Sequence, residues 1–278
     1  MKLAAIQMVS SPDVAANLKA ARALLEEAAA GGAELAVLPE YFCLLGRRDT
    51  DKLAAREPEG TGAIQRFLGD SARELKLWIA GGTLPMAIAA ANGSGTDEAR
   101  VRNTLLVFAP SGQRVARYDK IHLFRFDNGK ERYDESRVLE RGSEPVMLDL
   151  PSRDGHTWRV GLSVCYDLRF AELYRSYSSA GADLLLVPSA FTHTTGQAHW
   201  EVLMRARAIE NLAYVMAPAQ GGLHENGRRT WGHSMVVDPW GLILGERAEG
   251  AGVVFAEADA ARLAECRLQL PALEHRVL

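Results

Sequence analysis

The chain has 278 residues, 47% of them hydrophobic and 24% charged, a composition typical of a globular protein long enough to bury a large core. Its 32 basic and 35 acidic residues give a net charge of −3, which offers no electrostatic case for binding nucleic acid or an anionic membrane. We expect neither a signal peptide nor a membrane span, and three widely spaced cysteines without metal or disulfide spacing favour a cytoplasmic protein.

Strand-like apolar runs alternate with amphipathic helices along the chain, and no linker interrupts them, so we expect one domain over residues 1–278. The expected strands cover residues 2–8, 35–38, 77–83, 101–108, 114–118, 158–164, 184–188, 214–219, 233–237, 241–245 and 253–257. The expected helices cover residues 14–30, 62–75, 169–179, 199–211 and 259–268, and residues 90–98 have the composition of a hairpin loop.

This mixture of βα units and hairpins fits two sheets packed together and covered by helices, although an ordinary doubly wound sheet also fits the pattern. Asp13 suits the N-cap of the first helix, and Gly31 with Gly32 suits its end.

Cys165 closes the apolar run of residues 159–165 and precedes a mixed polar and apolar run, which predicts a strand ending where a helix begins. At a helix N-terminus, unpaired N–H groups and the helix dipole favour a thiolate. A lone cysteine in an apolar run is also typical of a small core residue.

Two further reactive side chains follow predicted strands. Glu40 comes after the apolar residues 35–39, and Lys120 lies near the end of the run over residues 115–123. Each alone is typical of a surface charge. Together with Cys165 they make chemical sense, because thiolate attack on a carbonyl needs a base, an oxyanion partner and an acid for the leaving group.

The motifs Pro39-Glu40-Tyr41, Tyr118-x-Lys120-x-His122-Leu123 and Cys165-Tyr166-Asp167-x-Arg169-Phe170, in this order, resemble the nitrilase superfamily of carbon–nitrogen hydrolases. The resemblance runs from residue 3 to residue 276. Residues 194–211 and 232–241 are similar to the branch that holds deaminated glutathione amidase and omega-amidase. The resemblance implies an α/β fold, a four-layer α-β-β-α sandwich.

The resemblance also implies roles for four residues. Glu40 is the general base, Lys120 the oxyanion stabiliser, Cys165 the nucleophile, and Glu135, in the pair Glu135-Ser136, an assisting carboxylate. The loop over residues 124–135 departs from the familiar patterns of the superfamily. The implied reaction hydrolyses the non-peptide C–N bond of a small amide through a thioester and releases ammonia, with no metal and no organic cofactor.

The favoured small-molecule substrate is deaminated glutathione. Omega-amidase, N-carbamoyl amino acid amidohydrolase and nitrilase activities are the alternatives within the superfamily, and a non-catalytic ligand-binding relative is a third class. The expected oxyanion and substrate contacts are Tyr166 through its backbone N–H, Ser189, Phe191, Thr192, Arg169, Arg228 and Arg229. Arginine suits carboxylates because it pairs with them through two hydrogen bonds.

The substrate contacts assigned to Arg169, Arg228 and Arg229 have structural alternatives. Arg169 and Asp167 would equally fix the start of the helix after Cys165, and residues 220–230 have the composition of a surface turn as well as of a substrate-facing lid. His193 and His199 lack the spacing of a helical zinc pair, so we expect hydrogen-bonding roles for them. Relatives imply a homodimer or higher homo-oligomer, formed through residues 169–179 and a C-terminal tail of about residues 270–278.

Overall fold

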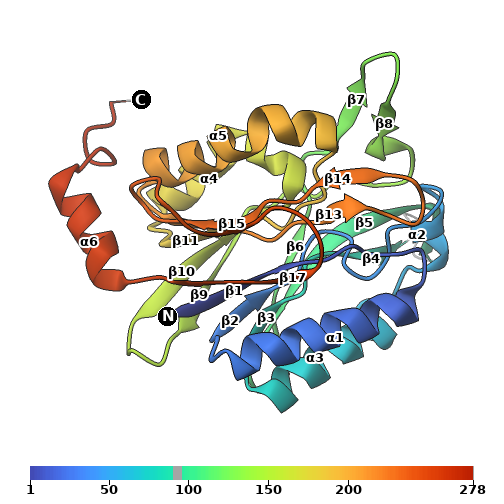
Figure 1. Cartoon of the computed structure of the whole chain (residues 1–278), viewed down its shortest axis with the longest axis horizontal. Helices are drawn as coiled ribbons and strands as arrows, with labels where there is room; N and C mark the ends of the chain where they lie inside the picture. The colour runs from blue at the N-terminus through green and yellow to red at the C-terminus, as the bar shows by residue number, and fades with distance from the viewer. Residues whose placement is uncertain (90–95, 278) are drawn as a thin grey trace.

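The computed structural model describes residues 1–89 and 96–277. Two β-sheets lie face to face, and a pair of helices covers the outer face of each, as Figure 1 shows. The α-β-β-α sandwich expected from the sequence is thereby confirmed, and it excludes the single doubly wound sheet. None of the helices in the described residues is both long and apolar enough to cross a lipid bilayer.

The first sheet has seven strands and mixes parallel and antiparallel pairs. In spatial order it consists of β17 (Gly252–Glu257), β1 (Lys2–Gln7), β2 (Leu35–Val37), β3 (Trp78–Ala80), β5 (Thr96–Phe108) and β4 (Leu84–Ala89), with β6 (Arg114–Asp119) also paired to β5. Its outer face is covered by α1 (Val14–Ala30) and α3 (Ala63–Leu75).

The second sheet has six strands. In spatial order these are β16 (Ile243–Arg247), β15 (Ser234–Val237), β12 (Tyr214–Ala217), β11 (Leu184–Leu186), β10 (Thr157–Leu162) and β9 (Val146–Pro151). Helices α4 (Ala171–Ser179) and α5 (His193–Asn211) cover it, and α6 (Ala260–Gln269) lies at one end of the molecule (Figure 1).

The remaining elements are short. They are the helix α2 (Asp51–Ala54), the 3-10 turns η1 (Glu135–Arg137) and η2 (Cys165–Arg169), and the hairpins β7 (Arg125–Asp127) with β8 (Arg132–Asp134) and β13 (Gly221–Leu223) with β14 (Arg229–Trp231). The β7–β8 hairpin projects from the body of the molecule (Figure 1).

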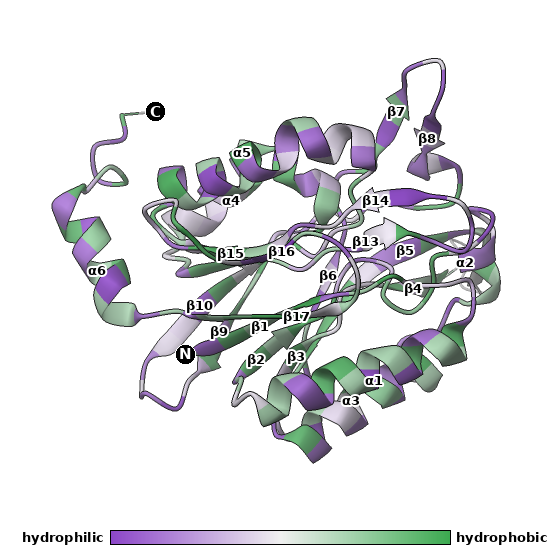
Figure 2. Cartoon of the chain, in the orientation of Figure 1, coloured by the Kyte–Doolittle hydropathy of each residue, from purple (hydrophilic) through white to green (hydrophobic). Residues whose placement is uncertain are grey.

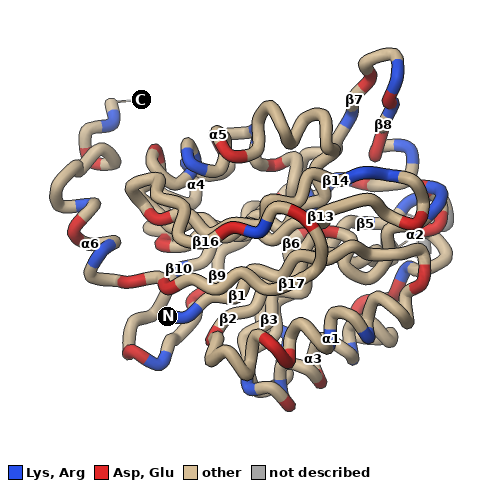
Figure 3. Tube along the Cα trace, viewed as in Figure 1, with Lys and Arg blue, Asp and Glu red and all other residues tan. Residues whose placement is uncertain are grey.

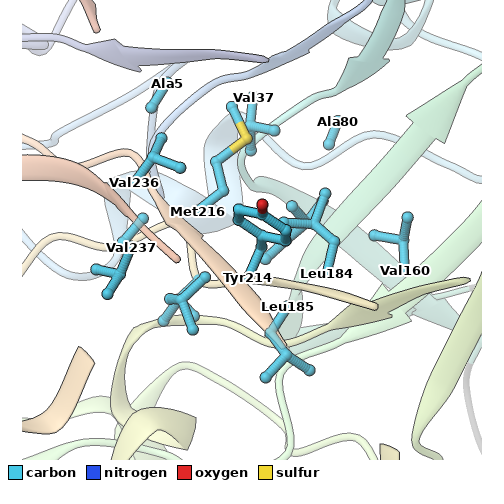
Figure 4. Close-up of a cluster of buried hydrophobic side chains, with 14 of the residues drawn as sticks. Ala5, Val37, Ala80, Val160, Leu184, Leu185, Tyr214, Met216, Val236 and Val237 are labelled. Atoms are coloured by element: carbon cyan, nitrogen blue, oxygen red, sulfur yellow. The ribbon is translucent and has the colours of Figure 1, made fainter. Parts of the chain in front are cut away.

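A single apolar core fills the space between the two sheets. Figure 4 shows Ala5, Val37 and Ala80 of the first sheet opposite residues of the second, among them Leu184 and Met216, and all five are fully buried. A second apolar layer lies between the first sheet and α1 with α3. In Figure 2 the central strands are mainly hydrophobic while the helices alternate in hydropathy, because only one helix face is buried.

The local end signals of the first helix work as expected. Asp13 is its N-cap and accepts a hydrogen bond from the Ala16 N–H, and the chain leaves the helix at Gly31. By contrast, α5 begins at His193, six residues before the expected start at His199. Thr192 caps it, and the weak helix formers of residues 194–196 conceal this first turn in the sequence.

Several strands have no strong signal in the sequence. The edge strands β4 and β9 contain Pro85 and Pro151, and proline is tolerated only at such edges because it donates no hydrogen bond to a neighbour. The β7–β8 hairpin consists of short charged strands. A hairpin loop was expected over residues 90–98. Residues 90–95 lie outside the described residues, and β5 already begins at Thr96.

Candidate active site

Four reactive side chains from distant parts of the chain meet at the ends of strands. Glu40 follows β2, Lys120 follows β6, Glu135 begins η1 and Cys165 begins η2. The Lys120 ammonium donates to Glu40 Oε1 at 2.9 Å and to the two Glu135 oxygens at 3.0 and 2.8 Å. The charges of Glu40, Lys120 and Glu135 all act on the thiol of Cys165. The structure therefore brings together all four residues that the sequence predicted.

Glu40 is almost entirely buried, and each of its oxygens has a fixed partner. Oε1 also accepts from the Asn103 side-chain amide at 2.8 Å, and Oε2 accepts from the Ala190 N–H at 3.0 Å. Neither partner carried a signal in the sequence, because Asn103 lies within a strand and Ala190 contributes only its backbone. These contacts hold the carboxyl in one orientation toward Cys165.

The backbone is unusual on both sides of the site. Cys165 has φ 51° and Tyr41 has φ 57°, values that non-glycine residues rarely adopt and that often accompany functional sites. The Cys165 N–H donates to the Pro188 carbonyl at 3.0 Å, and the Tyr41 N–H donates to the Thr83 hydroxyl at 2.9 Å. These bonds support the sharp turns that present Cys165 and Glu40 at the strand ends.

Asp167 joins the turn that carries Cys165 to the segment that carries Lys120. One of its oxygens accepts from the Tyr118 hydroxyl at 2.7 Å and from the Val164 N–H at 2.9 Å. The other accepts from the His122 N–H at 2.9 Å and lies 2.7 Å from the ring nitrogen of the same histidine. Asp167 is fully buried, and its bond to the Val164 N–H fixes the start of η2. This is the structural role that the sequence analysis gave as the alternative to substrate binding in this segment.

The buried Glu40 and the partly buried Glu135 have opposite pKa shifts. Burial raises the pKa of Glu40, and the negative charge of Glu135 raises it further. Burial also opposes ionisation of Glu135, but the charge and hydrogen bonds of Lys120 outweigh it and lower the pKa of Glu135. A pair of acids whose pKa values are pushed apart is typical of a site that needs one of them as a proton acceptor.

Lys120 stays charged although it is buried. Burial lowers the pKa of its ammonium, but Glu135 and Glu40 outweigh that effect and raise the pKa well above its usual range. Glu135 is held in turn by the Tyr41 hydroxyl at 2.8 Å and by the Phe124 N–H at 2.7 Å. A cation with this support is suited to holding negative charge that develops beside it.

The thiol of Cys165 is protonated in the resting site. Burial raises its pKa well above the usual range, and the Glu40 charge raises it further, while Lys120 opposes both. We expected Cys165 to lie at a helix N-terminus that stabilises its thiolate. Instead, Cys165 begins a 3-10 turn, and α4 starts only at Ala171. A thiol with a raised pKa needs a neighbouring base to form a thiolate, and Glu40 is the carboxyl whose charge acts most strongly on it.

A small pocket opens at the Cys165 side chain. Its lining residues are Phe124, Cys165, Tyr166, Arg169, Ala190, Phe191, Thr192 and Thr195. The Tyr166 N–H, one residue after the cysteine, has no protein acceptor within residues 1–89 and 96–277. It is therefore available as a second donor at the pocket, beside the charge of Lys120.

Other predicted contacts lie elsewhere. Ser189 is fully buried and donates to the Val187 carbonyl at 2.9 Å, so its neighbour Ala190 lines the pocket instead. Arg229 is exposed and pairs with Glu249 at 2.8 Å. Arg228 stacks over the ring of Tyr133 at 5.1 Å and lines a second cavity, while residues 220–230 form most of the β13–β14 hairpin.

The histidines noted in the sequence have hydrogen-bonding or packing contacts. His199 lies 3.2 Å from the Arg169 guanidinium, and the His193 ring packs against Trp231. In the part of the chain that the structure describes, no group of three or more His, Cys, Asp or Glu residues is arranged to hold a metal ion.

Residues 2–268 match the protein family described as carbon-nitrogen hydrolase. The deaminated glutathione amidase of Synechocystis sp. is 42% identical over 276 residues, which cover 99% of this chain and 97% of that protein. The omega-amidase NIT2 of Homo sapiens is 36% identical over 277 residues, which cover 99% and 94% of the two chains.

Solved structures agree with these relatives. Nit3 of Saccharomyces cerevisiae, a member of branch 10 of the nitrilase superfamily, superposes with a TM-score of 0.86 at 30% identity. The matched region covers 100% of this chain and 97% of the Nit3 chain. A mutant amidase from Nesterenkonia sp. AN1, in which acrylamide has added to the active site cysteine, has a TM-score of 0.77 at 27% identity and 98% coverage of both chains. This chain therefore belongs to the carbon–nitrogen hydrolases of the nitrilase superfamily and is an amidase-type enzyme.

Proposed function

We propose that the chain hydrolyses a small amide by nucleophilic catalysis at Cys165, with Glu40 as general base, Lys120 as oxyanion stabiliser and Glu135 as the carboxylate that keeps Lys120 charged. The observation that carries this proposal is the convergence of Glu40 and Lys120 on a buried thiol at a sharp backbone turn. Such a thiol needs a base, and the adjacent carboxyl with a raised pKa supplies one.

The reaction has two halves. Glu40 takes the proton of Cys165, and the sulfur attacks the amide carbon while Lys120 and the Tyr166 N–H hold the oxyanion. The tetrahedral intermediate collapses to a thioester as Glu40 returns the proton to the departing nitrogen. Glu40 then removes a proton from water, whose oxygen attacks the thioester, and Cys165 leaves with that proton, so the products are a carboxylic acid and the free enzyme.

The leaving group depends on the substrate. A primary amide releases ammonia, as the sequence prediction stated, whereas a substituted amide such as deaminated glutathione releases its amine. We favour deaminated glutathione because a relative with that activity is 42% identical over nearly the whole chain. The omega-amidase relative, at 36% identity, makes the release of ammonia from an omega-amide the second candidate. The presence of Arg169 in the wall of the Cys165 pocket supports it as the partner of a substrate carboxylate.

A panel of substrates tests both the mechanism and the preference. We expect the wild-type enzyme to cleave deaminated glutathione faster than 2-oxoglutaramate, carbamoyl amino acids, nitriles or simple aliphatic amides. Cys165→Ala should lower kcat by about 10⁴-fold or more, since removing a nucleophile abolishes the covalent route. Cys266→Ala is the matched control, because Cys266 is also a buried free cysteine but does not line the Cys165 pocket. Normal turnover by Cys165→Ala would refute the mechanism.

We further propose that residues 1–278 act as one domain in the cytoplasm and assemble into a homodimer or higher homo-oligomer. Residues 169–179 and about 270–278 are the proposed contacts. Exposed apolar side chains on the neighbouring α5 and on the turn between β15 and β16 support a second copy as the occupant of this face. They are Val202, Ile209, Trp240 and Leu242.

A further inference from the structure

A second small cavity lies beside the catalytic groups. Tyr41 and Glu135 form part of its wall, and Phe124 lines both this cavity and the Cys165 pocket. The proposed mechanism gives this cavity no task. A ligand bound in it would share the Phe124 wall with the Cys165 pocket.

Lys52, from α2, is a buried cation that lines this cavity. The residue is only 8% exposed, and its ammonium lies 4.8 Å from the centre of the Tyr41 ring. The carboxylate it pairs with, that of Asp49, is 3.7 Å away, beyond hydrogen-bonding distance, and is itself more than half exposed. Among the described residues, the ammonium donates no hydrogen bond. A buried charge with so little compensation is costly unless a ligand supplies the missing partner.

Arg228 brings a second positive charge to the same cavity from a different element, the turn between β13 and β14. Its guanidinium stacks on Tyr133 of β8 and forms no ion pair with any carboxylate in the described parts of the chain. Burial lowers the pKa of Lys52 and outweighs the opposing charges of Asp49 and Glu135, while the charge of Arg228 acts in the same direction as burial. Figure 3 shows basic positions around α2 and β14 at one end of the molecule.

The acidic side chains of the cavity wall have other partners. Glu135 accepts two hydrogen bonds from Lys120, and Asp134 accepts from the N–H and hydroxyl of Ser136 at the start of η1. Among the described residues, the only ion pair of these two cations is the loose contact of Lys52 with Asp49, and Glu135 and Glu40 attract the Lys52 ammonium from beyond ion-pair distance.

We propose that Lys52 and Arg228 form an anion subsite that binds a carboxylate of the substrate, while Arg169 faces a second carboxylate in the Cys165 pocket. The substrate class is then an amide with an anionic group on each side of the scissile C–N bond. This inference rests on the proposed amidase function and adds to it the recognition of the second end of the substrate.

The test compares a dicarboxylate amide with a neutral amide. Deaminated glutathione and butyramide serve as the two substrates for wild type, Lys52→Met and Arg228→Gln. We expect each variant to lower the ratio of kcat/KM for the dicarboxylate to kcat/KM for butyramide by roughly 10- to 100-fold, mainly through KM, as expected for losing a charged hydrogen bond. Arg132→Gln, an exposed arginine outside both pockets, should keep the wild-type ratio.

A second measurement avoids dependence on folding of the buried Lys52 variant. Glutarate should inhibit butyramide hydrolysis competitively, and the exposed-turn variant Arg228→Gln should weaken that inhibition by roughly 10-fold. Equal loss for both substrates, or unchanged inhibition by glutarate, would overturn the anion subsite. Failure of the wild-type enzyme to cleave any amide would instead overturn the proposed function.

Discussion

Two glutamates around one lysine have opposite pKa shifts because their burial and their partners differ. Glu135 receives two hydrogen bonds from Lys120 and others from Tyr41 and Phe124, which favour its charged form. Glu40 receives one from Lys120, and its complete burial, together with the negative charge of Glu135, outweighs Lys120 and raises its pKa. A carboxyl with a raised pKa accepts a proton more strongly than an ordinary one, which suits the deprotonation of a buried thiol.

The pH dependence of turnover tests this division. Glu40 acts as base only when ionised, so kcat/KM should rise as pH increases through its raised pKa. In Glu135→Gln the repulsion that raises the pKa of Glu40 is removed. The acid limb of the pH–rate profile should then move to lower pH by roughly 1 unit, the scale of a neighbouring-charge effect.

The matched control for that profile is Glu144→Gln, which neutralises an exposed carboxylate away from the catalytic groups and should leave the acid limb in place. An acid limb that stays fixed in Glu135→Gln would assign the limb to a group other than Glu40.

At the scale of elements, close backbone packing positions the catalytic base. Gly82, between β3 and β4, has φ 53°, and a Cβ added there would lie 2.0 Å from the Pro39 carbonyl oxygen. The next residue, Thr83, accepts the Tyr41 N–H. The turn that follows β3 therefore packs directly against the turn that carries Glu40.

Gly82→Ala should both destabilise the protein and impair catalysis. Left-handed strain and the backbone clash together should lower the free energy of unfolding by about 2–4 kcal/mol, measured by urea denaturation. The shift of Pro39 should also reduce kcat, because it displaces Glu40.

Gly155→Ala separates the strain of a positive φ from the clash with a neighbouring backbone. Gly155 also has positive φ, at 86°, but an added Cβ would meet nothing within 4 Å. We expect a loss of about 1 kcal/mol with unchanged kcat. Equal effects of the two substitutions would mean that the contact with Pro39 has no influence on the site.

At the scale of the whole molecule, several large apolar side chains remain exposed near one groove. On α5, Val202 is 69% exposed, and on the nearby turn Leu242 is 62% exposed, beside a groove lined by Arg205 and Trp240. Isolated apolar residues are common on surfaces, but several exposed ones near one groove support an interaction site. A second copy of the chain is the occupant that the proposed assembly requires.

Sedimentation velocity tests this assembly. We expect the wild-type protein to sediment as a dimer or larger species, and Val202→Asp combined with Leu242→Asp to shift it toward the monomer. Val115→Asp, which alters an exposed apolar residue on β6 instead, should keep the wild-type state. A monomeric wild-type protein at micromolar concentration would refute the proposed assembly.

The sequence by itself determined the features that depend on neighbours along the chain. Helix α1, with its Asp13 cap, and most central strands follow from local periodicity and end signals. The motifs around Glu40, Lys120 and Cys165 carried the family resemblance, and the comparisons confirm that family.

Only the tertiary structure decided which groups surround the reactive residues. Asn103 and Ala190 contact Glu40 across 63 and 150 positions of the chain, and Asp167 reaches Tyr118 across 49. Such contacts leave no local periodic pattern, and an alanine that contributes only its N–H leaves no chemical one. The protonation of Cys165 was likewise decided by burial and by neighbouring charges, because a pKa depends on the three-dimensional surroundings of a group rather than on its position in a motif.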